Sequence, residues 1–323
     1  TINADGSYTF VPVADWNGSV PQVTYEVTDG RDNGVQTAAL DITVTPVQDA
    51  HDDSRTAHAG APVTIDVLTN DGFTNGDKAI TGVTDGAHGT VSISNGQVIY
   101  TPTSGYVGTD TFTYTVTSGG KTETATVTLT LVNDAPQVGL AKTGSTAEDT
   151  TLTNGENLLT GASDLNGDAL TVKSFTVGNT TWAAGQTATL AGYGALTLNA
   201  DGSYTFVPVA DWNGNVPQVT YTITDGRTNG DVTSRLDISV TPVQDAFNDS
   251  QTGHGRDPLV IDVFNNDSFA NSDKAITATT NGAHGTVTVS NGKVVYTLND
   301  GYVGTDSFTY TVTSGGKTET ANV

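Results

Sequence analysis

The chain has 323 residues with no cysteine and no methionine, and its 35 acidic residues outnumber 12 basic ones, giving a net charge of −23. No disulfide can therefore stabilise it, a surface this acidic repels nucleic acid and anionic lipid, and no apolar run approaches the roughly 18 residues that a membrane span requires. The length is sufficient for several compact domains, and the excess of carboxylates attracts cations.

An internal repeat dominates the sequence. Residues 1–127 return at 197–323 with a constant offset of 196 and no insertion or deletion, and 91 of the 127 pairs are identical. Self-similarity at a long, fixed period is typical of domain arrays. An enzyme seldom needs two copies of itself in series, whereas a spacer or a multivalent binder often does. We therefore expect no enzymatic activity.

Two similar junctions divide the repeat into a long and a short unit. The segment VTPVQDA at 44–50 recurs at 240–246, and LTLVNDAP occupies 129–136. The expected domains are residues 1–48 (the C-terminal part of a long domain), 49–133 (a short domain), 134–244 (a complete long domain) and 245–323 (a short domain without its last strand). We expect a slice of a longer repetitive polypeptide, with its domains in a line and few contacts beyond nearest neighbours.

Alternating apolar residues predict β-strands along the chain. Residues 7–11, 23–27 and 111–117 alternate with period two, which is typical of half-buried antiparallel strands. Asp-Gly and Asn-Gly pairs between such runs favour hairpin turns, and no helix is convincing. Short strands in units of this length predict sandwiches. The aromatic residues expected between two sheets are Tyr8, Phe10, Tyr25, Phe112 and Tyr114, with their counterparts Tyr204, Phe206, Tyr221, Phe308 and Tyr310.

Four segments carry a resemblance to a known class of protein. Residues 63–136 resemble the bacterial cadherin-like and Ig-like repeats of giant secreted adhesins, and AEDTTL (147–152), SDLNGDALTV (163–172) and NADGSYTFVP (199–208) are similar to VCBS-type and cadherin-like repeats of the same proteins. The resemblance implies an all-β fold of tandem Ig-like and cadherin-like β-sandwich domains in a linear array. It also implies an extender region of an RTX-type adhesin, exported by type I secretion and stiffened by calcium. The short domains would be Ig-like and the long domains cadherin-like.

One turn has the spacing of a calcium loop. Asp164, Asn166 and Asp168 present alternating oxygen side chains around a glycine, as in the first half of an EF-hand loop. The second half does not match, because Ala169 and Phe175 stand where the loop needs its glycine and its bidentate glutamate. Further ligands must come from elsewhere. The resemblance implies that they are Glu148, Asp149, Asn133 and Asp134. The alternative is a solvated turn whose side chains bond only to their own backbone.

The linkers offer a second set of candidate calcium ligands. These are Asp49, Asp52, Asp53, Asp245 and Asp249. Such a linker is either merely solvated or bridged by a cation that relieves the repulsion between its carboxylates. Residues 70–77 and their copy 266–273 are expected to form structural turns, because a phenylalanine replaces one potential ligand and a lysine follows the loop.

Other candidate sites are explained more simply. His88 and His284 lie in Gly-Ala-His-Gly segments, where we expect turns. Trp16 and Trp212 are expected to cover the end of a sandwich core, with stacking on a sugar as the alternative. No group of residues forms a catalytic signature, and no local motif indicates a Lys–Asn crosslink.

Three functions remain. The leading one is a structural spacer of an extracellular, cell-surface adhesin or matrix fibre, used in cell adhesion or biofilm. The others are a carbohydrate- or peptide-binding module made multivalent by repetition, and a subunit of a self-assembling filament. The expected partners are neighbouring repeats of the same chain and, in a fibre, other copies, with no nucleic acid and no insertion into a membrane.

Overall fold

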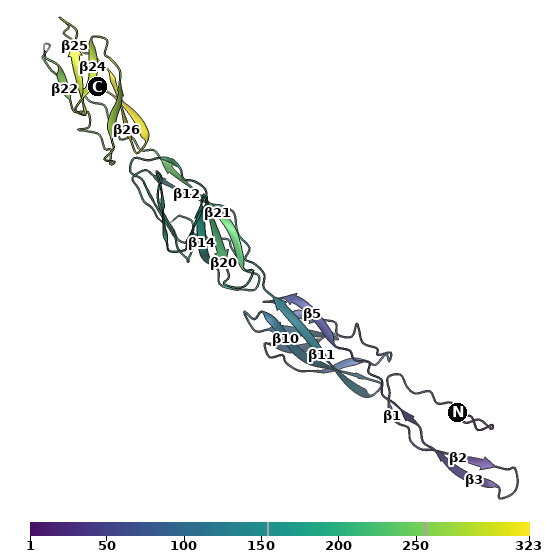
Figure 1. The fold of residues 1–323 in the computed structure, drawn as a ribbon. Coiled ribbons are helices and arrows are strands. Elements are labelled where there is room, and N and C mark those ends of the chain that lie inside the picture. The colour runs from purple at the N-terminus through teal and green to yellow at the C-terminus, as the bar shows by residue number, and fades with distance from the viewer. Residues whose placement is uncertain (154, 255–256) are drawn as a thin grey trace. The chain divides into compact units, whose positions relative to one another are not determined.

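A computed structural model describes residues 1–153, 155–254 and 257–323, and its regular elements in these ranges are all β-strands (Figure 1). The prediction of an all-β chain of tandem β-sandwich domains is therefore confirmed. The described residues include no helix with the length and apolar character to cross a membrane. The chain forms two compact units: unit 1 is Thr1–Asp134 with Leu165–Asp168, and unit 2 is Ala135–Asp164 with Ala169–Val323.

Two sheets enclose a core in the short domain of unit 1. One sheet has the strand order β5-β11-β10-β7 and the other β6-β9-β8. The strands are β5 (Asp53–His58), β6 (Val63–Ile65), β7 (Ala79–Val83), β8 (Gly89–Ser94), β9 (Gln97–Pro102), β10 (Gly108–Ser118) and β11 (Lys121–Val132). The core contains Tyr100, Tyr114, Leu129 and Leu131, each at most 1% exposed. Because threonines alternate with these apolar residues, one face of each strand is buried and the other is solvated.

A tight hairpin joins β10 and β11. The two strands pair over eleven residues, from Gly108↔Leu131 to Ser118↔Lys121. Gly119 and Gly120, at the turn, have φ of +55° and +71°. Two successive residues with positive φ form the hairpin turn that suits the twist of a sheet, and glycine adopts this conformation without strain.

The first and last strands of this domain are neighbours and run in the same direction. β5 pairs in parallel with β11, from Asp53↔Val127 to His58↔Val132, and the two arrows lie side by side in Figure 1. The other pairings in the two sheets of the domain are antiparallel. The chain therefore enters the domain through β5 and leaves it through the neighbouring strand, β11.

The long domain of unit 2 has the same general plan with larger sheets. Its sheets have the orders β12-β21-β20-β14-β15, with β19 beside β21, and β13-β18-β17-β16. The strands are β12 (Lys142–Ala147), β13 (Leu152–Thr153), β14 (Thr171–Val177), β15 (Thr180–Ala183), β16 (Thr187–Leu190), β17 (Gly194–Leu198), β18 (Tyr204–Pro208), β19 (Gly214–Asn215), β20 (Val219–Thr224) and β21 (Asp231–Thr241). Phe175, Leu196, Phe206 and Tyr221 are buried between the sheets. β12 again pairs in parallel with the last strand, β21.

The last domain of unit 2 repeats the short domain with shorter sheets. The sheets are β22-β25-β24 and β23-β26-β27. The strands are β22 (Leu259–Ile261), β23 (Ala275–Thr279), β24 (Gly285–Ser290), β25 (Lys293–Leu298), β26 (Thr309–Ser314) and β27 (Lys317–Asn322). Phe308 and Tyr310 are buried, as predicted for the counterparts of Phe112 and Tyr114.

Residues 1–48 correct one expectation. Tyr8 is 54% exposed and Phe10 is 39% exposed, whereas their counterparts Tyr204 and Phe206 are 3% and 0% exposed. The strands here are β1 (Gly18–Ser19), β2 (Val23–Thr28), β3 (Val35–Leu40) and β4 (Thr43–Val44), in two-stranded sheets. Tyr25, on β2, is only half-buried. The prediction of burial was wrong for these three residues because their counterparts are covered by strands from residues 142–198, and no such strands cover residues 1–48 in the described chain.

A buried carboxylate ties two loops of the short domain to its core. Asp110 is 4% exposed and accepts hydrogen bonds from the Tyr100 hydroxyl at 2.6 Å and from the amides of Ala87, His88 and Thr111 at 2.9–3.0 Å. Burial alone would raise the pKa of Asp110, but these donors favour the ionised form and hold the pKa below its usual value. Asp306 repeats the arrangement.

We expect Asp110→Asn to destabilise the short domain by about 1–3 kcal/mol at pH 7, because the amide leaves buried donors without their charged acceptor. The folded pKa lies below the unfolded value of about 3.9, so the ionised carboxylate stabilises the fold above that value and this stabilisation is lost as the pH falls. Melting temperatures measured from pH 7 to pH 2 should therefore converge for variant and wild type at low pH. A gap that stays constant with pH would contradict the assignment.

Candidate functional site

Five carboxylates meet at the junction of the long domain and the last domain, within unit 2. This carboxylate cluster consists of Glu148, Asp149, Asp211, Asp245 and Glu319. It contains two triads, Glu148–Asp245–Glu319 and Asp149–Asp211–Asp245, and in each triad one oxygen per residue lies within 4.8 Å of the others. Asp245 belongs to both triads. Glu148, Asp211 and Asp245 are 2–4% exposed, so much of this negative charge is removed from water.

The parallel pairing of β12 with β21 explains the position of Glu148. The pairs end at Ala147↔Thr241, and the Glu148 amide then donates to the Thr241 carbonyl at 2.9 Å. The Glu148 side chain accepts hydrogen bonds from the Val243 amide and, at 3.0 Å, from the Asn213 side chain. The start of the long domain therefore lies against its own exit. We expected Glu148 to lie beside the 164–168 turn; the pairing of β12 with β21 places it beside Thr241, where the long domain ends.

Asp149 and Asp211 connect three loops. Asp149 has a φ of +59°, and its carboxylate accepts the Asp211 amide at 2.8 Å. Asp211 in turn accepts the Ala270 and Asn271 amides, each at 2.8 Å, and the Ser314 hydroxyl. Burial is the main cause that raises the pKa of Asp149, and the charges of Asp211 and Asp245 raise it further. Asp211 thus holds two segments of the last domain against the long domain.

Asp245 carries the observation that indicates a ligand. Its Oδ1 accepts the Ser268 hydroxyl at 2.6 Å, whereas its Oδ2 is buried without a hydrogen-bond partner. Glu319 accepts the Asp245 amide at 2.8 Å, which brings a second carboxylate to the same place. In the described part of the chain, no Lys or Arg side chain forms an ion pair with any of the five carboxylates. Buried like charges repel one another unless a cation bridges them, so the cluster fits a hard divalent cation that takes oxygen ligands.

The first copy of this junction, in unit 1, contains counterparts of three of the five carboxylates. Asp15, Asp49 and Glu123 are the counterparts of Asp211, Asp245 and Glu319. Glu123 accepts the Asp49 amide at 2.7 Å, as in the second copy. Among the described residues, only the two triads around Asp245 meet the 4.8 Å distance. Asp49 is therefore a matched control for Asp245.

Asp15 forms the same kind of hydrogen bonds as its counterpart Asp211. It accepts the Asn75 amide at 2.8 Å and the Ser118 hydroxyl at 2.7 Å. Burial opposes ionisation, but the hydrogen bonds from Ser118, Asn75 and Thr74 outweigh it and lower the pKa of Asp15 to about 2. Burial, followed by the charges of Glu123 and Asp15, raises the pKa of Asp49.

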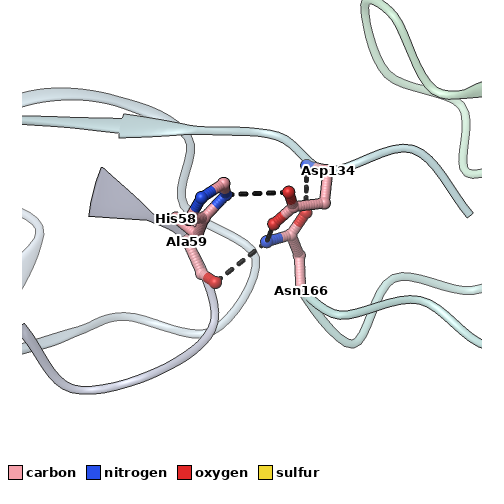
Figure 2. A network of polar contacts seen from close by, with 4 residues as sticks. All are labelled: His58, Ala59, Asp134 and Asn166. Atoms are coloured by element: carbon pink, nitrogen blue, oxygen red, sulfur yellow. Dashed lines mark hydrogen bonds and ion pairs between the residues drawn. The ribbon is translucent and has the colours of Figure 1, made fainter. Parts of the chain in front are cut away.

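The 164–168 turn contributes a different contact, drawn in Figure 2. Asn166 is 5% exposed; its carbonyl oxygen accepts the Asp134 amide at 2.6 Å, and its amide donates to the Ala59 carbonyl at 2.9 Å. His58 Nδ1 lies 2.7 Å from Asp134 Oδ1. A side-chain carbon at Gly60 would lie 2.7 Å from the Asn166 Cα, so the close approach requires glycine. We call His58, Ala59, Asp134 and Asn166 the amide bridge.

The amide bridge joins two of the residues expected to bind calcium, Asn166 and Asp134, through direct hydrogen bonds. Asn133 and Asp168 belong to the same unit, whereas Asp164 belongs to unit 2. The structure therefore divides the seven residues expected around this turn: Glu148 and Asp149 lie in the carboxylate cluster, and Asp134 and Asn166 lie in the amide bridge.

The remaining linker aspartates belong to the short domains and contact residues within them. The Tyr114 hydroxyl lies 2.9 Å from the His51 carbonyl oxygen and 3.0 Å from Asp71 Oδ1. Asp53 lies beside this hydroxyl, and burial, followed by the Asp71 charge, raises its pKa to about 6. Asp52 accepts the Thr126 amide at 2.8 Å. Asp249 with Asp267 and Tyr310 repeats the Asp53 arrangement.

The residues given a structural interpretation have structural contacts. Trp212 is 8% exposed and meets Tyr193 edge-on at 5.2 Å, which confirms that it covers the core. His88 stacks on Tyr106 at 4.0 Å. Phe73, in the 70–77 loop, is buried in the core. No property of Asp211 or Glu319 alone marked them as site residues; the signal that could have found them is their repetition beside the junctions.

Four segments of the chain match the models of known domain families. Residues 43–130 and 237–323 match the model of a bacterial Ig domain, residues 133–242 match a bacterial cadherin-like domain, and residues 1–45 match a cadherin-like domain. Both kinds of domain are typical of extracellular or surface proteins. No curated protein matches the chain.

Solved structures show distant likenesses. An endo-fucoidan hydrolase of glycoside hydrolase family 107 is 17% identical, with 84% of this chain and 42% of that chain covered and a TM-score of 0.25. This chain thus spans less than half of that protein. The extracellular cadherin domains 1–5 of protocadherin gamma B2 are 13% identical (95% and 65% covered, TM-score 0.29), and Drosophila N-cadherin EC1-4 is 14% identical (95% and 82% covered, TM-score 0.26).

Proposed function

The chain belongs to the bacterial Ig domain family, whose model matches more than half of its residues, and from this premise we propose that it forms spacer repeats of a large extracellular adhesin or surface fibre. Its role would be to carry other parts of that protein in cell adhesion or in a biofilm matrix, with calcium stiffening the junction that holds the carboxylate cluster. The proposal assigns the chain a structural role and no catalytic one.

The buried Asp245 Oδ2 is the observation that supports the calcium part of the proposal. Its carboxylate lies within both triads, and none of the five cluster carboxylates is neutralised by a lysine or arginine among the described residues. Ca²⁺ binds 6–8 oxygens, commonly from carboxylates. When bound, it would supply positive charge and shared coordination in place of repulsion.

The five carboxylates come from two successive domains, which supports the proposal that calcium stiffens the junction between them. Glu148, Asp149 and Asp211 come from the long domain, whereas Asp245 and Glu319 come from the linker and β27 of the last domain. Closing the cluster therefore fixes one domain against the next. Trp212 does not favour the sugar-binding alternative, because its ring is covered by Tyr193 and Lys317.

The test compares calcium with chelator in the wild type, in Asp245→Asn and in the matched Asp49→Asn. A cation that binds only the folded state stabilises it by about 2.7 kcal/mol at a hundredfold excess over Kd. We expect calcium to raise the melting temperature of the wild type and of Asp49→Asn by several degrees, and Asp245→Asn to lose most of this rise.

Stiffening needs a separate measurement. Since the chain has no cysteine, dyes can be attached at Val207→Cys and Val289→Cys, two exposed positions on either side of the junction. Single-molecule distance distributions should narrow with calcium. Equal distributions in calcium and chelator, with equal melting temperatures, would refute the stiffening mechanism.

A further inference from the structure

The long domain carries an acceptor sequence for N-linked sugars, a feature that the proposed spacer role does not use. Asn179 is followed by Thr180 and Thr181, which gives the pattern Asn-x-Ser/Thr with a residue other than proline at x. Enzymes that attach sugars to asparagine recognise this pattern. Asn17, Asn248 and Asn266 begin the same pattern with a serine. Because so short a pattern recurs without function, the surroundings of each asparagine decide which one can accept a sugar.

Asn179 lies at the tip of a hairpin. β14 and β15 pair antiparallel up to Val177↔Thr180, so Gly178 and Asn179 form a two-residue turn. Gly178 has a φ of +59°, and a glycine with positive φ at the first of two turn positions is typical of a type II′ hairpin turn. Asn179 is exposed, and a side-chain carbon at Gly178 would meet no atom within 4 Å. The turn therefore projects into solvent.

The other three asparagines are less accessible. The Asn266 amide nitrogen, to which a sugar would be attached, donates to the Asn248 carbonyl at 3.0 Å. The Asn248 side-chain oxygen accepts the Asn322 amide at 2.8 Å, which holds this side chain against the strand β27. Asn17 is half-buried. A sugar at Asn248 or Asn266 would compete with these hydrogen bonds, whereas the Asn179 side chain forms none with the described residues.

A transferase must also reach the hydroxyl two residues after the asparagine. Thr181 is exposed and lies on β15, the edge strand of its sheet. Its hydroxyl shares a hydrogen bond of 2.8 Å with the Thr176 hydroxyl of β14. β15 has only four residues, and short edge segments open locally at a small cost in free energy. Both groups of the acceptor sequence can therefore be reached while the rest of the domain stays folded.

We propose that Asn179 is an N-glycosylation site whose substrate is a sugar activated as a glycosyl diphosphate, transferred by a separate glycosyltransferase. The Asn179 amide nitrogen forms a bond to the anomeric carbon of the sugar. The bond between that carbon and the diphosphate oxygen breaks, the diphosphate leaves with the electron pair, and the nitrogen loses one proton. The attached sugar then lies beside the free edge of β15, whose residues carry no charge, and hinders pairing of this edge with another chain.

The first test incubates the folded chain with UDP-glucose and a soluble N-glycosyltransferase that accepts Asn-x-Ser/Thr sequences. We expect the intact mass to rise by one glucose residue, and peptide mapping to place this residue on Asn179. Occupancy at Asn179 should exceed that at Asn17, Asn248 and Asn266 by at least about tenfold, because modification of those three requires further local unfolding. Thr181→Val, which keeps the side-chain shape without the hydroxyl, should accept no sugar at Asn179.

Four synthetic peptides that carry the four acceptor sequences are the matched control. Similar modification of all four would show that the preference for Asn179 in the chain comes from the fold. A folded chain without sugar on Asn179 would overturn the proposal, as would equal occupancy of the four asparagines. The second test maps the protein purified from cells that make it naturally. We expect a glycan on Asn179 there, and an unmodified Asn179 in that protein would also overturn the proposal.

Discussion

Replacing Phe175 with alanine should lower the melting temperature of the long domain by more than about 10 °C. Phe175 is 0% exposed, lies opposite Tyr221 on β20 and stacks on Trp182 at 5.5 Å. Truncating a buried phenylalanine costs about 3–5 kcal/mol, because apolar contacts are lost and a cavity remains. For a domain of this size each kcal/mol shifts the midpoint by roughly 4–8 °C.

Differential scanning calorimetry resolves this effect if the domains melt separately. Val207→Ala, at a position that is 46% exposed, is the control that also shortens an apolar side chain of the long domain and should change the midpoint little. Similar shifts for the two variants would mean that Phe175 does not lie in the core.

Asp211→Ala should loosen the last domain from the long domain even when calcium is absent. The variant removes the acceptor of the Ala270 and Asn271 amides and of the Ser314 hydroxyl. Each hydrogen bond to a charged group contributes about 1.5–3 kcal/mol, so we expect a loss of several kcal/mol in the contact. Hydrogen exchange at Ala270 and Asn271, measured in chelator, should accelerate at least tenfold.

The control for this variant is Asp201→Ala. Asp201 is exposed, and its carboxylate accepts hydrogen bonds from the amide and hydroxyl of Ser203, two residues along the chain. It should leave exchange at residues 270 and 271 unchanged. Unaltered exchange in Asp211→Ala would show that these amides are protected by other contacts.

The strands and most core residues could be predicted from the sequence because the alternation of apolar residues that produces them is a local pattern. The alternation around Phe112 and Tyr114 places both side chains on one face, and both are buried. The same reasoning was wrong for Tyr8 and Phe10, whose alternation is identical to that of Tyr204 and Phe206. Alternation shows which face can be buried, whereas burial depends on a covering sheet from another part of the chain.

The candidate site could be predicted only in part because its geometry follows from strand order. Glu148 and Asp149 were identified as candidate ligands, but nothing local shows that β12 runs parallel to β21 and so brings them to the domain exit. Asp211 and Glu319 join them through contacts 59–74 residues apart in sequence. Asn166, by contrast, has the spacing of a calcium ligand and forms hydrogen bonds as an amide.

The parallel pairing of first and last strands has a mechanical consequence. In such a pair the incoming end of one strand and the outgoing end of the other point in opposite directions, so tension applied through the chain pulls the strands past each other. The six residue pairs between β5 and β11, and the six between β12 and β21, then bear load together in shear instead of peeling apart one at a time.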